Sequence, residues 1–437
     1  MKRNVSIIIL TYNQLECTKA CIESIRQYTN PNCYELIIVD NASTDGTPAW
    51  LKDQKDIIYQ LNFKNEGFPK GCNIGISLAN PENHILLLNN DTIVTTNWLE
   101  NLQNALESDE KIGAVGAMSN HNDNRQGAPF TYTSVEEMQK LAKQNNIKTN
   151  EKELEDKVFL IGFCLLIKNE VMHQIGTLDE GYSPGYIEDN DLSLRILKLG
   201  YRLVLCHNVF IHHELGTSFR KDWTKFYRIL NKNRKYFYQK WKFSAFAFDE
   251  GKNYSMPLIT DAKKVLEISS GIGVTALMLR YQLKDANVVG VEKDANKRKI
   301  CELLIPTVSK LDDVKEMDFD LILIGDALEN VKNPKRYLKK ISKKLKSGGK
   351  IIGEIQNVAS ITSLRHFLND TWYDSKKRLY TISDIWNLFL SEGFYDGKYF
   401  GWCKQRTEEE NQILEQFQKY PFRNLEITTY AFSFTKK

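Results

Sequence analysis

The chain has 437 residues, of which 42% are hydrophobic and 26% are charged, and its formal net charge is +4. This length exceeds one ordinary hydrophobic core, so we expect two or three domains of globular composition. The small net charge argues against nucleic acid as the main partner. Eight cysteines are scattered without a CxxC motif, which favours a reducing cytoplasm. No apolar run approaches the roughly 20 residues of a membrane span.

The first half alternates runs typical of strands with runs typical of helices. We expect strands over Val5–Leu10, Tyr34–Val39, Ile57–Leu61 and His84–Leu88, and helices over Glu16–Tyr28, Thr47–Lys55, Lys70–Leu78 and Trp98–Ser108. This order predicts an open, mostly parallel α/β sheet with helices on both faces. Ligands of such sheets bind beyond the carboxyl ends of the strands, where Asp40 and Asn89–Asp91 lie.

The middle of the chain is less regular. Residues 121–155 are polar and are expected to form an excursion or loop. Strand character resumes over Val158–Ile167 and in the apolar run Val204–Ile211, and a basic, aromatic helix is expected over Phe219–Trp241. Because residues 243–260 lose periodicity and carry Gly, Pro and Ser, we expect a linker there, between domains at 1–242 and 261–437.

A second α/β rhythm follows the predicted linker. Strands are expected over Val265–Ile268, Val288–Val291, Phe319–Ile324 and Lys350–Ile355, with helices over Val274–Leu283, Asp294–Leu304, Pro334–Leu345 and Ile382–Glu392. Two final strands, Phe394–Phe400 and Glu426–Phe434, are expected to pair antiparallel. The second half is therefore predicted to be another sheet of the Rossmann-like class, and no internal repeat links the two halves.

The polar residues of the first half match the needs of sugar transfer from a nucleotide diphosphate. That reaction requires a divalent cation, groups that hold the nucleoside and, in most inverting enzymes, a carboxylate base. Asp91 follows a buried strand, and hard oxygen ligands suit Mg²⁺ or Mn²⁺. Asp189 follows a glycine-rich turn, and His213 follows an apolar run from which it can complete the metal shell.

Each of these residues also has a structural interpretation. Asp40 is placed to cap the turn after its strand. Asp189 is placed to cap a helix that starts near Leu192, although Asp191 fits that role better. His213 is also consistent with a hydrogen-bonded core histidine.

Several motifs occur in order over about residues 4–240. They are Val5–Asn13, Ile38–Thr47, Asn65–Phe68, Gly71–Gly75, Leu88–Thr92, Leu178–Glu180, Glu188–Leu192, Gly200–Tyr201 and His213–Ser218. This ordered set resembles the family 2 glycosyltransferases, which have the GT-A fold. Asn89 takes the first position of the DxD-type motif, where it offers an oxygen without a charge.

The resemblance implies a role for each matching position. The residues implied in nucleotide-sugar binding are Thr11, Asp40, Asn65, Asn73 and Asn90. Asp91 and His213 would bind Mg²⁺ or Mn²⁺, and Asp189 would be the general base, with Glu188 beside it. The implied partners are a nucleotide-sugar donor and a glycan or lipid-linked saccharide acceptor.

The predicted helix Phe219–Trp241 interleaves Lys and Arg with Trp, Tyr and Phe. One interpretation is docking on an anionic membrane surface, where a lipid-linked acceptor lies. The other is an amphipathic helix that covers the sheet, which we favour.

The second half carries a different set of motifs. Glu267–Gly273, Val291–Asp294, Asp320–Glu329 and Leu345–Lys350 resemble those of the class I S-adenosylmethionine-dependent methyltransferases, over about residues 262–437. The resemblance implies a cofactor site for S-adenosylmethionine made by Glu267, Gly271, Gly273, Glu292 and Asp326. Ser269 stands where glycine is common in that family, and Asn330 where histidine is usual.

Together these features predict a bifunctional enzyme of bacterial surface glycan assembly. The first half would transfer a sugar with inversion, and the second half would methylate a sugar hydroxyl. The alternatives are a second half that is a non-catalytic binding module, and a non-catalytic glycan- or membrane-docking protein. We expect a cytoplasmic protein, with peripheral attachment to the inner face of the plasma membrane as a further option.

Overall fold

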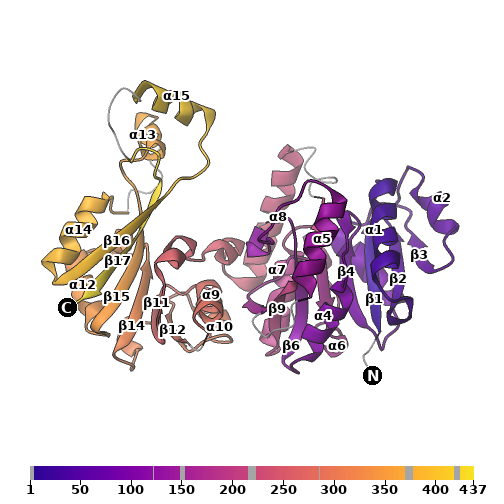
Figure 1. Cartoon of the computed structure of the whole chain (residues 1–437), viewed down its shortest axis with the longest axis horizontal. Helices are drawn as coiled ribbons and strands as arrows, with labels where there is room; N and C mark the ends of the chain where they lie inside the picture. Colours follow the sequence, from indigo (N-terminus) through magenta and orange to yellow (C-terminus); the bar gives the residue numbers. More distant parts are fainter. Residues whose placement is uncertain are drawn as a thin grey trace. The chain divides into compact units, whose positions relative to one another are not determined.

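The structure is a computed structural model that describes residues 4–121, 123–147, 153–214, 223–284, 286–369, 377–417 and 424–437. The chain divides into two compact units, residues 1–249 and 250–437. The division falls inside the segment predicted as a linker. Each unit contains one large sheet with helices against it (Figure 1).

The sheet of the first unit has eight strands in the order β3-β2-β1-β4-β8-β6-β9-β7. Their bounds are β1 Val5–Thr11, β2 Tyr34–Asp40, β3 Ile57–Leu61, β4 His84–Asn89, β6 Ile112–Met118, β7 Leu154–Lys157, β8 Cys164–Ile167 and β9 Arg202–Phe210. Strands β3, β2, β1 and β4 pair in parallel. Strand β8 is antiparallel to β4 and β6, and β7 is antiparallel to β9. The predicted α/β class with a mostly parallel sheet is therefore confirmed.

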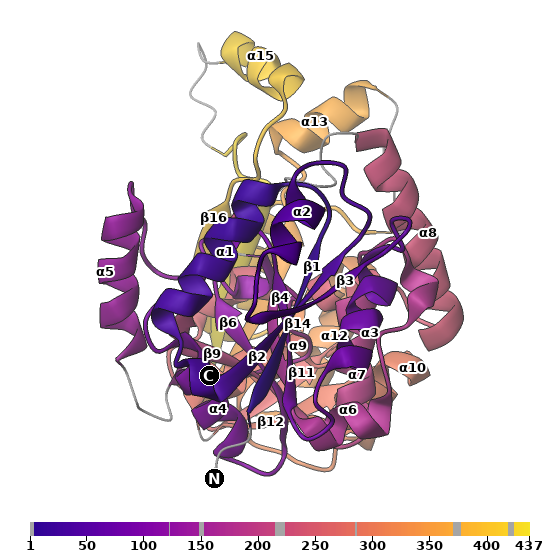
Figure 2. The ribbon, with the colours of Figure 1, turned by 90° about the vertical axis from the view of Figure 1, so that its right-hand side faces the viewer.

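The alternation of side chains along β1 explains how both faces of this sheet are covered. Ile7 and Ile9 belong to the core shared with α1 (Leu15–Tyr28) and α4 (Trp98–Glu107). Ile8 and Leu10 point to the other face, where they pack against the glycines of α3 (Phe68–Leu78); a Cβ at Gly75 would lie 2.4 Å from Ile8 Cγ2. Figure 2 shows α1 and α4 on one side of the sheet and α3 on the other. The apolar run is continuous because both faces are buried.

The structure corrects two sequence predictions for the middle of the chain and adds one strand. The polar range 121–155, expected to be a loop, contains the helix α5 (Val135–Asn146), in which Met138 and Ala142 are buried. Of the strand expected over Val158–Ile167, only Cys164–Ile167 (β8) is a strand, and β7 ends just before this range, at Lys157. The buried strand β6 was not predicted at all.

Two further helices complete the first unit near its candidate site. Helix α7 runs over Glu188–Lys198, so it begins four residues before the predicted start. Helix α8 runs over Trp223–Trp241 and buries Ile229, Asn233 and Phe237. The predicted start of this helix at Phe219 and the motif residues 215–218 lie outside the described residues. Remaining elements are α2 Thr47–Lys52, α6 Asn169–Ile175, β5 Thr92–Ile93 and β10 His212–His213.

The sheet of the second unit has seven strands in the order β13-β12-β11-β14-β15-β17-β16. Their bounds are β11 Lys264–Ile268, β12 Asn287–Val291, β13 Thr307–Val308, β14 Phe319–Gly325, β15 Leu345–Gln356, β16 Phe394–Trp402 and β17 Thr429–Lys436. Strand β17 pairs antiparallel with β15 and β16, which confirms the predicted antiparallel end, and the other pairs are parallel.

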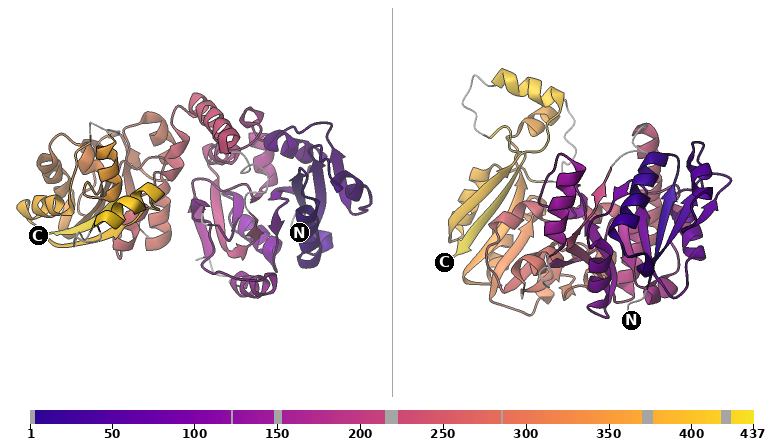
Figure 3. Two further views of the ribbon diagram at one scale, coloured as in Figure 1. Left: turned by 90° about the horizontal axis from the view of Figure 1, so that it is seen from above. Right: turned by 45° about the vertical axis from the view of Figure 1, so that its right-hand side comes forward.

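Helices cover both faces of this second sheet. On one face α12 (Pro334–Ser342) and α14 (Ile382–Ser391) pack on β14, β15 and β17. On the other face α9 (Val274–Leu283) and α10 (Ala295–Cys301) pack on β11 and β12. Figure 1 shows the two pairs on opposite sides of the strands. Two more helices, α13 (Ile361–Leu368) and α15 (Glu408–Phe417), lie side by side (Figure 3), joined by Arg365 to Glu409 and Glu410.

The segment predicted as a linker packs onto both units. Phe243 and Phe248 are buried and contact the ring of Phe237 in α8. Lys252 and Ser255 are buried in the second unit. In the described part of the chain, no helix has the length and apolar character that crossing a bilayer requires.

Candidate functional site

The carboxyl ends of β1, β2 and β4 bring the predicted nucleotide-binding residues to one edge of the first sheet. Thr11 and Asp40 are register partners at the ends of β1 and β2. Asn90, directly after β4, donates from Nδ2 to Thr11 Oγ1 at 3.4 Å. The sheet order reverses between β1 and β4, and α/β sheets bind ligands at such a switch point.

The two oxygens of Asp40 have different surroundings. Oδ2 accepts from the backbone N–H of Ser43 at 3.0 Å, which is the turn-capping arrangement. Oδ1 is buried and has no hydrogen-bond partner among the described residues. Burial raises the pKa of this carboxyl. A buried carboxylate oxygen without a donor is costly, so Oδ1 fits a ligand that brings a hydroxyl or N–H group.

The two predicted asparagines hold the surrounding loops. Asn65 Oδ1 accepts from the backbone N–H of Gly67 at 2.9 Å. Asn73 Nδ2 donates to the carbonyl of Leu178 at 2.9 Å, and the N–H of Leu178 donates back to Asn73 Oδ1 at 2.9 Å. These two hydrogen bonds connect Asn73, in α3, to the segment before Glu180. Contact between Asn73 and a nucleotide remains a prediction.

The predicted metal ligands meet beside the end of β4. The short strands β5 and β10 pair antiparallel and place His213 opposite Thr92. His213 Nε2 lies 3.2 Å from Asp91 Oδ1 and 3.2 Å from Asn89 Nδ2. The imidazole stacks on Phe163, with ring centroids 5.1 Å apart. His213 is thus neither remote from the acidic motif nor an isolated core histidine.

This donor set fits a hard divalent cation. It offers a carboxylate, an imidazole and an amide group, and Mg²⁺ and Mn²⁺ are commonly held by one or two protein ligands plus phosphate oxygens. Within the described ranges no group of three or more His, Cys, Asp and Glu side chains is arranged to hold a metal ion.

Sequence inspection missed the residues that fix the backbone of His213. Asn120 Oδ1 accepts from the His213 N–H at 2.8 Å, and Asn120 Nδ2 donates to the His213 carbonyl at 3.3 Å. His121 Nε2 contacts the same carbonyl at 2.9 Å. Both residues follow β6, so the signal that would have found them was the overlooked apolar run Ile112–Met118.

The predicted base and its neighbour occupy the first turn of α7. Asp189 Oδ2 accepts from the Gly162 N–H at 3.4 Å, and Oδ1 accepts from the Asn190 N–H at 2.8 Å. Glu188 is buried, and its Oε2 has no hydrogen-bond partner among the described residues. Burial, with a smaller effect from the charge of Asp189, raises the pKa of Glu188 to about 8. Burial also raises the pKa of Asp189.

The expectation that Asp191 caps this helix is wrong. The N-cap is Ile187, and Asp191 lies inside the helix with no exposed surface. Its carboxylate is paired with Arg195 Nε at 2.9 Å and Lys240 Nζ at 2.7 Å, and it accepts from Trp241 Nε1 at 2.8 Å. Asp191 therefore ties α7 to α8.

One short segment joins the base to the metal ligands. Gly162 contacts Asp189, while its neighbour Phe163 stacks on His213 and accepts from the N–H of Asn89 at 2.9 Å. The candidate base and the candidate metal site thus belong to one continuous constellation.

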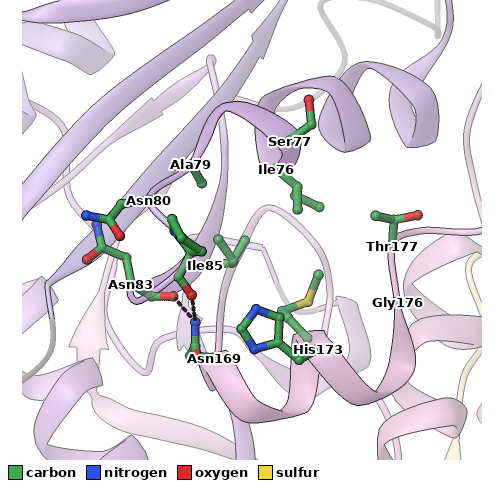
Figure 4. A pocket seen from close by; sticks show the side chains of 12 residues that line it. Ile76, Ser77, Ala79, Asn80, Asn83, Ile85, Asn169, His173, Gly176 and Thr177 are labelled. Atoms are coloured by element: carbon green, nitrogen blue, oxygen red, sulfur yellow. Dashed lines mark hydrogen bonds between the residues drawn. The ribbon is translucent and has the colours of Figure 1, made fainter.

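The cavity drawn in Figure 4 is a different place. It has a volume of about 390 Å³ and is lined by the end of α3, the start of β4 and α6, at the amino ends of the strands. Asn169 spans it and donates to the carbonyls of Pro81 and Asn83. None of the predicted site residues lines this cavity.

The second unit has its own set of polar residues at the carboxyl ends of β11 and β12. Glu292 Oε2 accepts from the Gly271 N–H at 2.8 Å, and Oε1 accepts from the Asp294 N–H at 2.8 Å. Gly271 and Gly273 have φ of 57° and 95°, which glycine adopts without strain. Ser269 also has a positive φ, 54°, so the turn forms although serine replaces glycine.

Two other predicted cofactor residues are already paired. Glu267 is fully buried, and its Oε1 contacts Lys252 Nζ at 2.5 Å. Asp326 Oδ2 accepts from Lys377 Nζ at 3.0 Å. The turn, its glycines and the fixed Glu292 carboxylate are consistent with a nucleoside cofactor beyond the strand ends.

The two folds, each with polar residues at its strand ends, match two families of group-transfer domains. Residues 6–176 match the family model described as "Glycosyl transferase family 2", and residues 231–396 match the model described as "Methyltransferase domain". The chain therefore combines a family 2 glycosyltransferase domain with a methyltransferase domain. The first match contains Thr11 to Asp91 but ends before Glu188, Asp189 and His213.

Similar proteins cover parts of the chain. "Uncharacterized protein y4gI" of Sinorhizobium fredii is 26% identical over 255 residues, 56% of this chain and 28% of that protein. "Glycosyltransferase AglE" of Haloferax volcanii is 23% identical over 217 residues, 48% of this chain and 66% of that protein. The chain thus spans less than two thirds of either relative. A crystal structure of a SAM-dependent methyltransferase from Thermotoga maritima aligns with 20% identity and a TM-score of 0.34, over 49% of this chain and 99% of that one.

Proposed function

We propose that residues 1–249 transfer a sugar, with inversion, from a nucleotide-sugar donor to a saccharide acceptor in bacterial surface glycan synthesis. The observation that carries this proposal is the convergence of Asp91, Asn89 and His213, which the segment Gly162–Phe163 joins to Asp189. Family 2 membership supports the reaction class.

In the proposed mechanism each residue has one task. Thr11, Asp40 and Asn90 hold the nucleoside, and the free Oδ1 of Asp40 accepts from a hydroxyl or N–H of the ligand. Asp91 and His213 would hold a Mg²⁺ or Mn²⁺ ion, which when bound neutralises charge on the leaving diphosphate. Asp189 takes the proton from the attacking acceptor hydroxyl. Its raised pKa brings the carboxylate closer to the basicity that a general base needs near neutral pH.

The test compares Asp189→Asn with Glu188→Gln in the full chain. We expect Asp189→Asn to lower transfer by at least about 10²-fold, the usual contribution of a general base, while nucleotide-sugar binding stays nearly unchanged. Glu188→Gln should retain more activity, because the Glu188 side chain is buried within the first turn of α7 and is less accessible to an acceptor than Asp189. Transfer by Asp189→Asn near the wild-type rate would refute the assignment of the base.

We further propose that residues 250–437 bind S-adenosylmethionine and methylate a sugar hydroxyl. The turn Ser269–Gly273, the carboxylate of Glu292 and the methyltransferase family match support this proposal. The alternative is a binding module without methyl transfer. Calorimetry with S-adenosylmethionine separates binding from no binding, and methyl transfer from radiolabelled cofactor to a glycan separates the enzyme from the module.

Helix α8 buries Ile229, Asn233 and Phe237, as expected of a covering amphipathic helix. Finally, we propose that its outward face attaches the protein to an anionic lipid surface. This helix contains no Asp or Glu. Its outward residues form a basic aromatic surface that consists of Trp223, Lys225, Tyr227, Arg228, Lys232, Lys235 and Tyr238. Trp223, Tyr227 and Tyr238 are each more than half exposed, at 56%, 53% and 56%. Such a surface combines interfacial aromatic rings with charges that attract anionic lipid.

A sedimentation assay with phosphatidylserine-containing vesicles tests this attachment. We expect Lys225→Glu/Arg228→Glu to release the protein, because each basic residue near such a surface contributes about 1 kcal/mol. The control Lys140→Glu/Lys143→Glu makes the same charge change on the exposed face of α5 and should bind like wild type. Equal loss in both variants would show that net charge alone drives binding.

A further inference from the structure

A buried lysine lies within the candidate cofactor site of the second unit. Lys252 is only 7% exposed, and its Nζ contacts Glu267 Oε1 at 2.5 Å and donates to the Ser269 carbonyl at 3.0 Å. Burial raises the pKa of Glu267, and the ammonium of Lys252 opposes this effect. Buried charges are stable only when they are paired, so the two residues depend on each other.

The position of Lys252 coincides with the reversal of strand order. Successive strands run outward from β11 in one direction to β12 and in the other to β14, so the switch point lies between β11 and β14. Glu267 and Ser269 are at the carboxyl end of β11, and Gly325 ends β14. A Cβ on Gly325 would lie 2.9 Å from Lys252 Cε, so the lysine side chain crosses from one strand end to the other. This is the crevice in which such sheets bind ligands.

Lys252 belongs to a strap, residues 250–255, that is held by polar contacts. The N–H of Lys252 donates to Thr275 Oγ1 at 2.9 Å. The N–H and Oγ of Ser255 both donate to Glu354 Oε1, at 2.9 and 2.7 Å. Glu250 pairs with Lys297 at 2.6 Å, and the Glu250 side chain is 44% exposed. Of these contacts only the Glu250–Lys297 pair involves an exposed side chain and is therefore weak. Release of Lys252 requires the buried contacts of the strap to be replaced, and a bound cofactor is what would replace them.

We propose that the strap is autoinhibitory. Lys252 pairs with the carboxylate of Glu267, which S-adenosylmethionine would use, so the cofactor binds only when Lys252 leaves Glu267. The cofactor carries a sulfonium and an ammonium, and Glu267 is a buried anion in its crevice. Lys252 already neutralises that anion, and a second cation in the same confined place would be repelled. This inference rests on the proposed cofactor binding by residues 250–437.

Calorimetry on the full chain tests the strap through the variant Lys252→Met. We expect S-adenosylmethionine to bind roughly tenfold more tightly than to wild type, within the usual range of coupling between two competing states. The control Lys263→Met removes an exposed lysine at the opposite edge of the same sheet and should leave the affinity unchanged. Equal or weaker binding by Lys252→Met would overturn the autoinhibitory strap, and weaker binding would in addition indicate that Lys252 holds the cofactor's carboxylate. Absence of binding in all three proteins would instead overturn the proposed cofactor binding, and the strap with it.

A second measurement on the wild-type chain does not depend on the folding of a variant. Lys252 is buried behind Glu267, so it should react slowly with an acetylating reagent. Saturating S-adenosylmethionine should increase its acetylation rate several-fold, while Lys263 stays constant as the internal reference. Slower acetylation of Lys252 in the presence of the cofactor would overturn the proposal.

Discussion

Asp40 shows how one side chain serves structure and ligand binding at the same time. Its Oδ2 caps the turn at Ser43, and its Oδ1 is buried without a partner. The capping role and the binding role, which are alternatives in the sequence, are divided between two oxygens. In Asp191, by contrast, the carboxylate is paired with Arg195 of α7 and with Lys240 of α8, so its role is structural.

Glu188 gives a prediction for the dependence of stability on pH. Its pKa rises from 4.5 to about 8 in the folded protein. Below about pH 4.5 the carboxyl is protonated in both the folded and the unfolded protein, so folding does not bury a charge at this position. As pH rises towards 8 the unfolded chain releases the proton more readily than the folded chain, so stability is lost. The loss is complete above about pH 8.

The variant Glu188→Gln removes this effect because glutamine stays neutral. We expect the stability of the variant relative to wild type to increase as pH rises from 5 to 8, by on the order of a few kcal/mol, because a difference of one in pKa between the folded and unfolded states corresponds to about 1.4 kcal/mol. Urea unfolding of both proteins at pH 5, 7 and 8.5 measures the difference. A difference that does not change with pH would contradict the raised pKa.

At the scale of elements, the inner face of α8 organises the approach to the base. Asn233 is fully buried, and its Nδ2 donates to the carbonyls of Tyr182, Gly185 and Tyr186 at 2.6, 2.7 and 3.1 Å. The chain then enters α7 through Tyr186 and Ile187, with φ of 75° and 76°. A β-branched residue rarely adopts such a φ, so the surrounding contacts must hold this strained segment in place.

The variant Asn233→Leu tests this support. The Tyr182 carbonyl keeps the N–H of Gly185 as a donor, whereas the carbonyls of Gly185 and Tyr186 lose the buried Asn233 donor, so we expect about 1–3 kcal/mol of destabilisation and reduced sugar transfer. The matched control Asn231→Leu changes an exposed asparagine on the same helix and should alter stability by less than about 0.5 kcal/mol. Denaturant unfolding and a transfer assay give both quantities. Equal effects of the two variants would show that Asn233 has no special role.

At the scale of the whole molecule, the chain carries two sheets with separate cores and separate strand-end sites. We predict that a nucleotide sugar with Mn²⁺ and S-adenosylmethionine stabilise different units. A ligand at 100 times its Kd stabilises its domain by about 2.7 kcal/mol. Calorimetric unfolding of the full chain should therefore show one transition that responds to each ligand. A single transition that moves equally with both ligands would contradict independent units.

The sequence by itself determined the two α/β classes, the positions of most strands along the chain and the polar residues that follow those strands, whereas the order of the strands in each sheet came from the structure. It did so because continuous apolar runs mark buried parallel strands, and polar motifs directly after them mark the edge where ligands bind. It failed at β6 and α5, where glycine and alanine in the strand and polar residues in the helix weakened the periodic pattern.

Only the tertiary structure decided which polar side chains have a partner. Asp191 and Asp189 are two residues apart, yet packing of α8 neutralises one and leaves the other beside Gly162. Asn89 and Asp91 meet His213 because β10 pairs with β5. Lys252 reaches Glu267 because its segment folds into the crevice between β11 and β14. Such pairings depend on contacts between distant parts of the chain, which no local pattern of residues records.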